Sequence, residues 1–201
     1  MSARPSLYRW MGLLVALLWA VIASGCAHPI SLAGNPVALV GSGKSKVDIA
    51  VGLAISEEDR KREIITPGGG GDKVSYLPYR DLETGIYIAF SESFTKVVRI
   101  SGSQDPKVKA EALRYLVTPQ ISTTSYSPSL LTWPPTVFTV ELVCKISDAE
   151  GKSVTEVRAM GEGRAEFDEF KTDFSLAAKR ASDDALAKLV KALGAETGKL
   201  R

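Results

Sequence analysis

Alternating apolar and polar positions predict most of the strands in this sequence. Residues 46–55 (KVDIAVGLAI) carry an apolar side chain at every second position, with mostly small residues between them. Residues 137–146 alternate in the same way, and residues 153–163 return after a short turn, which predicts a hairpin. Residues 115–125 are β-branched and polar in alternation, which favours a strand. Pro119 inside this stretch favours an edge position or a bulge.

Apolar residues at helical spacing predict two longer helices. In the first, Asp81 is the expected N-cap, and apolar side chains recur every three or four residues as far as Val97, where a short strand follows. The second helix is expected over residues 174–193, with Gly194 as its C-cap. A shorter helix is expected over residues 107–113, directly after a proline that suits a first turn.

This order of elements predicts an α+β fold, a two-layer sandwich in which a mixed, mostly antiparallel sheet carries helices packed on one face. We find no internal repeat within residues 46–194, so this range is interpreted as a single domain, followed by a tail at residues 195–201. Four consecutive glycines within residues 66–72 predict a flexible loop, because glycine loses much conformational freedom in regular structure.

The beginning of the chain has a different pattern. Arg4 and Arg9 precede an uncharged apolar run, and the small residues 23–25 lead into Cys26. A basic start, a short apolar run and a small-residue cleavage site are typical of a secretory signal. The run is short for a plain transmembrane anchor, which needs about 20 apolar residues. Residues 26–45 mix Pro, Gly and Ser with a few apolar residues, which predicts a flexible tether.

Net charge argues against a nucleic-acid partner. The whole chain has 25 basic and 23 acidic residues. The signal holds two of the basic residues and no acidic one, so its removal leaves 23 of each. A formally neutral chain without a long basic cluster lacks the electrostatic footprint of nucleic-acid binding.

Histidine and cysteine are too few for most catalytic or metal sites. His28 is the only histidine and lies two residues from Cys26, so a Ser-His or Cys-His pair finds no histidine inside the domain. Cys144 is the only other cysteine, and we interpret it as a small hydrophobe on a buried strand. We therefore predict no catalytic residue, no metal site and no cofactor.

Carboxylates leave one catalytic alternative open. Acidic residues lie at the end of the last predicted strand and directly after it, and two carboxylates that act as acid and base are the chemistry of glycan hydrolysis. The other interpretation is a solvated connection, with Phe167 and Phe170 tucked under the last helix. The acidic residues concerned are Glu162, Glu166, Asp168 and Glu169.

Residues 126–135 (YSPSLLTWPP) are the best candidate for a partner-binding loop. Three prolines exclude a helix or an inner strand, loops on a rigid scaffold carry recognition, and Trp is favoured at hot spots. The alternative is that this segment covers one end of the core, and residues 76–79 (YLPY) carry the same two possibilities. The candidate partner-binding residues are Leu130, Leu131, Trp133, Tyr76 and Tyr79.

Cys26 and the residues before it resemble a bacterial lipoprotein signal, whose lipobox ends in a small residue and a cysteine. Ala23 is a departure, because lipoboxes usually have Leu at that position. The resemblance implies that residues 1–25 are removed and that Cys26 is lipidated, which attaches the protein to a membrane. Ala27, rather than Asp, follows the cysteine, and this implies the outer membrane, with the domain facing the periplasm.

The predicted elements follow one another as a lipobox, a tether, strand KVDIAVGLAI, helix LETGIYIAFSESFTKVV, strand YLVTPQIS, hairpin TVFTVELVCKISDAEGKSVTEV and a closing helix. This arrangement resembles the small outer-membrane lipoproteins that share the curli-secretion and penicillin-binding-protein-activator type of domain, including the YajG-like group. The GGGG and YSPSLLTWPP loops fall outside it. The resemblance implies a non-enzymatic, lipid-anchored periplasmic accessory protein that binds or helps assemble another envelope protein or polymer, and that sometimes oligomerises. The alternative is a carboxylate-dependent envelope glycan hydrolase.

Overall fold

The structure is a computed structural model, and it describes residues 27–43, 46–129, 132 and 134–200. The expected signal peptide and Cys26 lie outside these residues. The described part is built from two sheets and five α-helices. Within it, no helix is both long enough and apolar enough to cross a bilayer.

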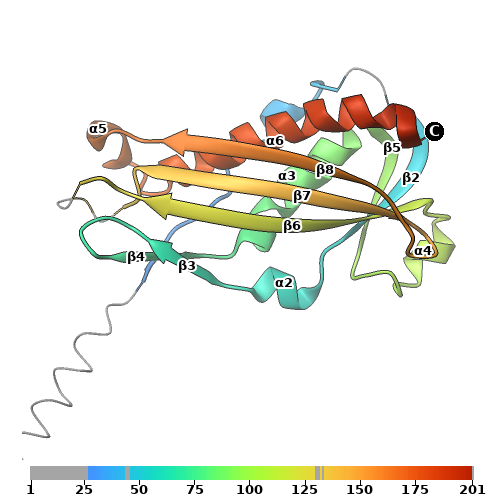
Figure 1. The fold of residues 1–201 in the computed structure, drawn as a ribbon, viewed down its shortest axis with the longest axis horizontal. Helices are drawn as coiled ribbons and strands as arrows, with labels where there is room; N and C mark the ends of the chain where they lie inside the picture. Colours follow the sequence, from blue (N-terminus) through green and yellow to red (C-terminus); the bar gives the residue numbers. More distant parts are fainter. Residues whose placement is uncertain (1–26, 44–45, 130–131, 133, 201) are drawn as a thin grey trace, which may run out of the picture.

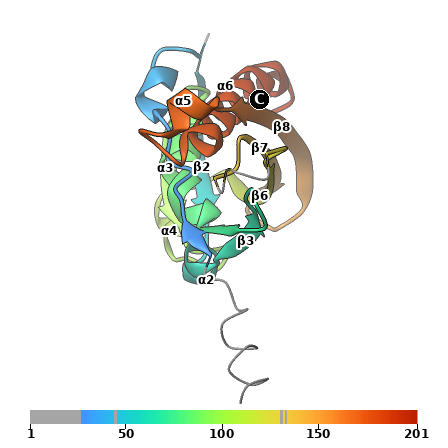
Figure 2. The ribbon, with the colours of Figure 1, turned by 90° about the vertical axis from the view of Figure 1, so that its left-hand side faces the viewer.

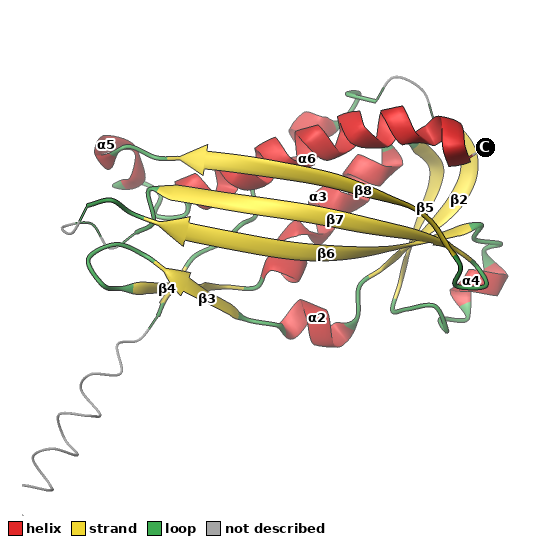
Figure 3. Cartoon of the chain, in the orientation of Figure 1, coloured by secondary structure: helices red, strands yellow, loops and turns green. Residues whose placement is uncertain are grey.

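The larger sheet has five strands, which are in spatial order β5 (Phe94–Ile100), β2 (Val47–Ala54), β6 (Tyr115–Tyr126), β7 (Val137–Asp148) and β8 (Ser153–Arg164). β2 is parallel to both of its neighbours, whereas β7 is antiparallel to both β6 and β8. Figure 3 shows these last three strands side by side as the longest part of the sheet. The predicted hairpin of β7 and β8 is confirmed.

The smaller sheet has three strands, in the order β1 (His28–Pro29), β4 (Lys73–Tyr76) and β3 (Ile64–Pro67). β1 is parallel to β4, and β3 and β4 form an antiparallel hairpin. This hairpin includes the first two residues of the loop predicted over residues 66–72, because Thr66 pairs with Val74 and Pro67 with Lys73. Strands of two to four residues are too short to show a periodic pattern, so the sequence does not reveal this sheet.

Helices cover one face of the larger sheet, as Figure 1 shows. The two long ones are α3 (Pro78–Ser91) and α6 (Leu176–Glu196). Three short helices lie around the sheet, and they are α2 (Glu57–Lys61), α4 (Lys107–Ala110) and α5 (Phe167–Phe170). The predicted α+β class is confirmed.

A small apolar cluster lies on the other face of the sheet, beside α4. Ala50 and Ala54 of β2 pack against it, and Gly52 between them leaves room for the side chains that cover this face. The small residues that alternate with the apolar ones in β2 therefore allow a second layer to pack closely. The members of the cluster are Ile100, Val108, Leu113 and Leu116.

One face of β7 forms the centre of the main core, as its alternation predicts. Five alternate side chains are at most 1% exposed, and these are Phe138, Val140, Leu142, Cys144 and Ile146. Burial raises the pKa of the Cys144 thiol to about 12, so the thiol stays protonated at neutral pH. The interpretation of Cys144 as a buried hydrophobe is confirmed.

Pro119 lies in a strand that has neighbours on both sides. It pairs with Cys144 of β7 on one side. On the other side, β2 pairs with β6 only as far as Val117. Pro119 therefore has no β2 residue opposite it that would need a backbone N–H from β6. The predicted edge position or bulge is wrong for β6, which is the central strand, and the strand tolerates Pro119 because the residue lies beyond the pairing with β2.

Helix α6 packs closely on β8 because glycines face it. A Cβ atom on Gly161 or Gly163 would collide with backbone atoms of α6 around Ala181. Asp184 of α6 also accepts a hydrogen bond from the Glu162 N–H, at 3.0 Å, along the outer edge of β8. This contact shields an edge strand that would otherwise be open to pairing with another chain.

Residues 27–43 pack on the domain, and we call them the N-terminal strap. The Ile30 N–H donates to the Ser75 carbonyl oxygen at 2.9 Å, which continues the pairing of β1. The Leu32 side chain is fully buried, and its N–H donates to Asp81 Oδ2 at 2.9 Å. The prediction of a flexible tether is therefore wrong for these residues.

The second half of the strap is held in the same way. The Asn35 N–H donates to Asp183 of α6 at 2.8 Å, directly before the 3-10 helix η1 (Pro36–Leu39). The Gly43 N–H donates to Glu92 Oε2 at 3.0 Å, and this bond is the main cause of the lowered pKa of Glu92. Carboxylates from distant parts of the chain thus bind the strap backbone.

The boundaries of α3 differ from the prediction. The helix begins at Pro78, whose fixed φ suits a first turn, so Asp81 lies inside that turn rather than at the N-cap. The helix ends at Ser91. Phe94 begins β5 because it pairs with Val47 of β2, a contact that the helical spacing of apolar residues does not reveal.

The end of the chain also differs from the prediction. Helix α6 runs past Gly194, the expected C-cap, and the 3-10 helix η2 (Thr197–Leu200) follows it. The Leu200 side chain is fully buried in the main core. Residues 195–200 therefore belong to the packed fold rather than to a tail.

Replacing Gly163 with Ala tests the close packing of α6 on β8. The added methyl group would meet backbone atoms of Ala177 and Ala181, so we expect the free energy of unfolding to fall by about 1–3 kcal/mol. Chemical denaturation measures this quantity. Gly102→Ala is the matched control, because nothing lies within 4 Å of a Cβ atom added there. Equal losses in the two variants would contradict the packing.

Replacing Asp81 with Ala tests the docking of the strap. The Leu32 N–H loses its acceptor, so we expect the strap to open about tenfold more often, which corresponds to about 1.4 kcal/mol. Amide hydrogen exchange of residues 30–34 measures the opening. Asp48→Ala is the control, because Asp48 accepts a hydrogen bond from Thr95 at the surface instead. Unchanged exchange in Asp81→Ala would show that other contacts hold the strap.

Candidate functional site

Three connections meet at one end of the molecule, which we call the loop end. They join β3 to β4 (residues 68–72), β6 to β7 (residues 127–136) and β8 to α6 (residues 165–175). In Figure 1 they lie at the left, opposite α4, and Figure 2 looks onto this end of the molecule. Loops at one end of a sheet are a common position for binding sites, because the scaffold holds them in place.

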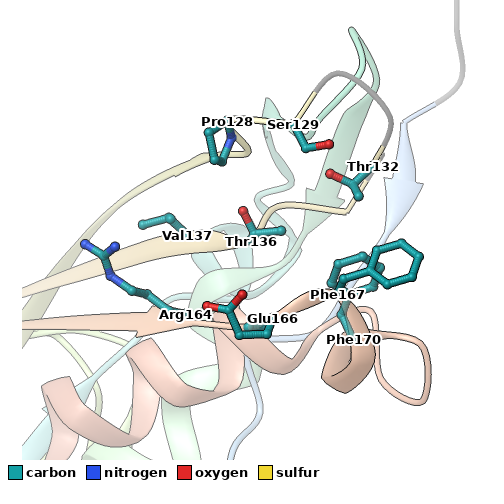
Figure 4. Close-up of a pocket in the computed structure, with 10 residues that line it drawn as sticks. Pro128, Ser129, Thr132, Thr136, Val137, Arg164, Glu166, Phe167 and Phe170 are labelled. Carbon is teal, nitrogen blue, oxygen red and sulfur yellow. The ribbon is translucent and has the colours of Figure 1, made fainter.

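A cleft of about 290 Å³ opens between two of these connections, and we call it the end cleft. In Figure 4, Ser129, Thr132 and Thr136 lie on one side of it, across from Glu166 and Phe167. Ser129 and Thr132 belong to the YSPSLLTWPP segment, and Thr136 directly follows it. Glu166 and Phe167 belong to the acidic and aromatic cluster after the last strand. The structure thus brings together two stretches that the sequence identifies for separate reasons.

The lining of the end cleft combines apolar and polar groups. Val137, Ala165 and Phe170 are buried apolar residues, and hydroxyl groups lie on the side of the β6–β7 connection. Ligand sites commonly combine apolar surface, which supplies affinity, with a few polar groups that fix orientation.

The wall formed by the β6–β7 connection is held by hydroxyl and backbone contacts. Ser127 Oγ and Thr132 Oγ1 lie 2.9 Å apart, and the Thr136 carbonyl oxygen accepts a hydrogen bond from the Ala165 N–H at 3.0 Å. Gly69 of the glycine loop packs so closely against the Thr132 carbonyl that a Cβ atom would collide with it. The glycine loop therefore supports this wall.

The opposite wall is held by Glu169 of α5. Its carboxylate accepts hydrogen bonds from the Arg180 guanidinium, at 2.8 and 3.0 Å, and from the Glu166 N–H at 3.0 Å. These bonds, with Arg180 as the larger cause, lower the pKa of Glu169 to about 2. The same guanidinium donates to the Arg164 carbonyl oxygen at 2.7 Å. Arg180 thus joins α5, α6 and the end of β8.

Phe167 and Phe170 have different environments. Phe170 is buried, whereas Phe167 is 57% exposed, so the prediction that both rings tuck under the last helix is wrong for Phe167. The two rings meet edge to face with centroids 5.3 Å apart, and Lys171 Nζ lies 4.5 Å from the Phe167 centroid. Phe167 therefore presents apolar surface at the rim of the end cleft.

The structure describes only two of the five residues that were predicted to bind a partner. Leu130, Leu131 and Trp133 belong to the β6–β7 connection but lie outside the described residues. Tyr76 and Tyr79 are buried, so the prediction of a partner contact is wrong for both.

Tyr76 instead joins the smaller sheet to β6, and Tyr79 joins α3 to β6. Tyr76 Oη lies 2.7 Å from Thr123 Oγ1, and Tyr79 Oη accepts a hydrogen bond from the Ile121 N–H at 3.4 Å. A buried Tyr usually needs such a partner for its hydroxyl group, and the sequence alone does not show which residue supplies it.

Glu166 lines the end cleft and caps α5, where its carboxylate accepts a hydrogen bond from the Glu169 N–H. The other three acids considered for hydrolysis form separate ion pairs. These pairs are Glu162–Arg164, Asp168–Lys171 and Glu169–Arg180. A general acid in glycan hydrolysis needs a raised pKa, whereas the pKa of Glu169 is lowered. Among the residues that the structure describes, no group of three His, Cys, Asp or Glu side chains is placed to hold a metal ion.

Acid should loosen α5. The pKa of Glu169 falls from an ordinary value of 4.5 to about 2 in the folded state. Its ionised form therefore stabilises α5 fully above about pH 4.5, and this stabilisation is lost as the pH falls toward 2. We expect amide protection of residues 166–171, corrected for intrinsic exchange, to fall over this window.

The variant Glu169→Gln should show low protection of α5 at every pH, because it lacks the carboxylate that binds Arg180. Asp168→Asn is the control, since Asp168 is 89% exposed and pairs with Lys171 instead. Wild-type protection that persists at pH 2 would contradict the role of Glu169.

Comparisons with known proteins do not assign a family. No family model and no curated protein matches the sequence. Among solved structures, the chain is similar to the crystal structure of protein XCC0632 from Xanthomonas campestris, described under the family model DUF330, with a TM-score of 0.49 and 14% sequence identity. The match covers 86% of this chain and 93% of that chain. The function is therefore inferred from the residues of the protein itself.

Proposed function

We propose that this protein is a lipid-anchored, non-enzymatic accessory protein of the bacterial envelope that binds an envelope partner in the end cleft. Cys26, which ends the lipobox-like segment, carries the lipid in this proposal and holds the domain at the outer membrane, facing the periplasm. The end cleft is the observation that carries the proposal, because two stretches with separate sequence signals form its two walls.

The fixed walls of the end cleft support a binding role. Gly69 packs against one wall, and Glu169 ties the other wall to Arg180. A site that is already formed loses little conformational entropy when a ligand binds. The exposed Phe167 ring at the rim adds apolar surface that a partner can cover, and aromatic residues are favoured in such contacts.

The glycan hydrolase alternative receives less support from the same residues. Hydrolysis needs two carboxylates on either side of the substrate, one of them with a raised pKa. Beside the end cleft, Glu169 has a lowered pKa and is bound to Arg180. We therefore favour binding over hydrolysis.

A photo-crosslinking residue at the rim of the end cleft tests the proposal in intact cells that express the full chain. We place p-benzoylphenylalanine at Phe167 and, as the matched control, at Met160 on the open face of β8. The native side chains are 57% and 59% exposed. We expect a discrete adduct with an envelope component from position 167 and none from position 160.

The second part of this experiment blocks the end cleft with a large side chain. Ser129→Trp should lower the adduct yield from position 167 about tenfold, because the added ring occupies the partner's place. Ser122→Trp adds the same ring to the exposed face of β6 and should leave the yield unchanged. Equal adducts from both positions, or an adduct that is insensitive to Ser129→Trp, would contradict the proposal.

A further inference from the structure

The described chain begins with residues that are fixed to the domain. His28 pairs with Val74 of β4 in parallel register. Three residues later, the Ser31 N–H donates to Ser175 Oγ, at 3.1 Å, beside the start of α6. Cys26 precedes His28 by two residues, so their Cα atoms are at most about 7 Å apart. A group attached to Cys26 is therefore held close to the body of the domain.

This attachment lies at the loop end. β4 begins directly after the glycine loop, and His28 Nε2 lies 3.9 Å from Asp72 Oδ2 of that loop. Figure 2 shows β1, in blue, on the same side of the molecule as α5 and β3. The turn at Glu150 lies at the opposite end, about 40 Å away, because β7 has twelve residues at about 3.4 Å each.

Exposed apolar side chains gather at the same end. Eight large apolar side chains are exposed in the described residues, and half of them lie at or beside the loop end. These four are Ile65, Tyr126, Phe167 and Phe174. Aromatic side chains are favoured at the boundary between water and the lipid headgroups.

The loops of the loop end carry more acidic than basic side chains, but most of these acids lie in ion pairs, such as Glu169 with Arg180 and Asp173 with Lys179. Lys73 directly follows Asp72, and Lys171 Nζ lies 2.7 Å from Asp168 Oδ1. Lys171 also lies over the Phe167 ring. A lysine can extend its ammonium group to headgroup phosphates while the apolar groups beside it lie deeper. Contact with a bilayer would therefore depend on apolar burial more than on attraction to anionic lipids.

We propose that the loop end rests on the surface of the bilayer that holds the Cys26 lipid, with the Phe167 ring among the headgroups. This inference rests on the lipid anchor of the proposed function. The lipid supplies most of the membrane affinity, and the docked strap keeps the loop end close to the surface. Weak burial of one or two rings then sets the orientation. The end cleft then opens at the membrane surface, so a partner bound in the cleft and the lipid headgroups share the exposed surface of the Phe167 ring.

Fluorescence quenching in the full-length, lipidated protein tests the orientation. We attach the NBD fluorophore to a cysteine introduced by Asp168→Cys or by Glu150→Cys, while the buried Cys144 stays unlabelled. The protein is placed in vesicles of phosphatidylethanolamine and phosphatidylglycerol that contain a doxyl-labelled lipid. We expect quenching to be at least about twofold stronger at position 168 than at position 150, with little dependence on salt. Equal quenching at the two positions would overturn the inference.

Two further measurements make the result specific. Phe167→Ala should weaken the quenching at position 168, whereas Met160→Ala, which removes an equally exposed apolar side chain, should not. The opposite result would overturn the role of Phe167. Metabolic labelling of Cys26 with palmitate separates the two proposals. A labelled Cys26 without a quenching difference overturns the orientation alone, and an unlabelled Cys26 overturns the anchor and the orientation with it.

Discussion

The close approach of α6 to β8 is the contact on which the other parts of the fold depend. The absence of a side chain at Gly163 lets the helix backbone lie directly on the strand. From that position, Asp183 reaches the Asn35 N–H of the strap, and Arg180 reaches Glu169 of α5. A bulkier residue in the strand would move the helix outward and lengthen these bonds together, and hydrogen bonds weaken steeply when their geometry is lost. Strand packing, strap docking and the wall of the end cleft are thus linked through one helix.

The periodicity of apolar residues predicts helices and strands whose buried face repeats along the chain. It does not predict segments that are held by hydrogen bonds to single residues far away in the sequence. The alternation in β7 and the helical stripe in α6 each repeat over many residues, so the buried face can be identified from the sequence. The strap has no such repeat. Its Leu32 N–H binds an acceptor 49 residues away, and the acceptor for the Asn35 N–H is 148 residues away. Such contacts depend on the completed fold, and no local pattern indicates them.

The candidate site shows the same difference between local signals, which the sequence reveals, and long-range contacts, which it does not. Three prolines in one segment and an acidic, aromatic cluster in another are local signals, so both walls of the end cleft can be identified from the sequence. Their meeting cannot be predicted, because it depends on where β6, β7 and β8 end. Tyr76 shows the converse case. Tyr76 lies two residues before Pro78, in a stretch that suggests a surface loop, yet its side chain is only 3% exposed, and Thr123 and Thr66 lie within hydrogen-bond distance of its hydroxyl group.

The docked strap changes what a lipid anchor on Cys26 can do. A flexible tether over residues 26–45, 20 residues long, would have an r.m.s. length of about 25 Å and would let the domain adopt any orientation. Instead, Asp81, Asp183 and Glu92 each accept a hydrogen bond from a strap N–H. Bonds from N–H groups to ionised carboxylates are roughly twice as strong as neutral ones, and they hold the strap together with the buried side chains of Ile30, Leu32 and Leu39. The pairing of β1 with β4 and the positions of three acids would therefore determine which end of the domain lies next to a lipid on Cys26.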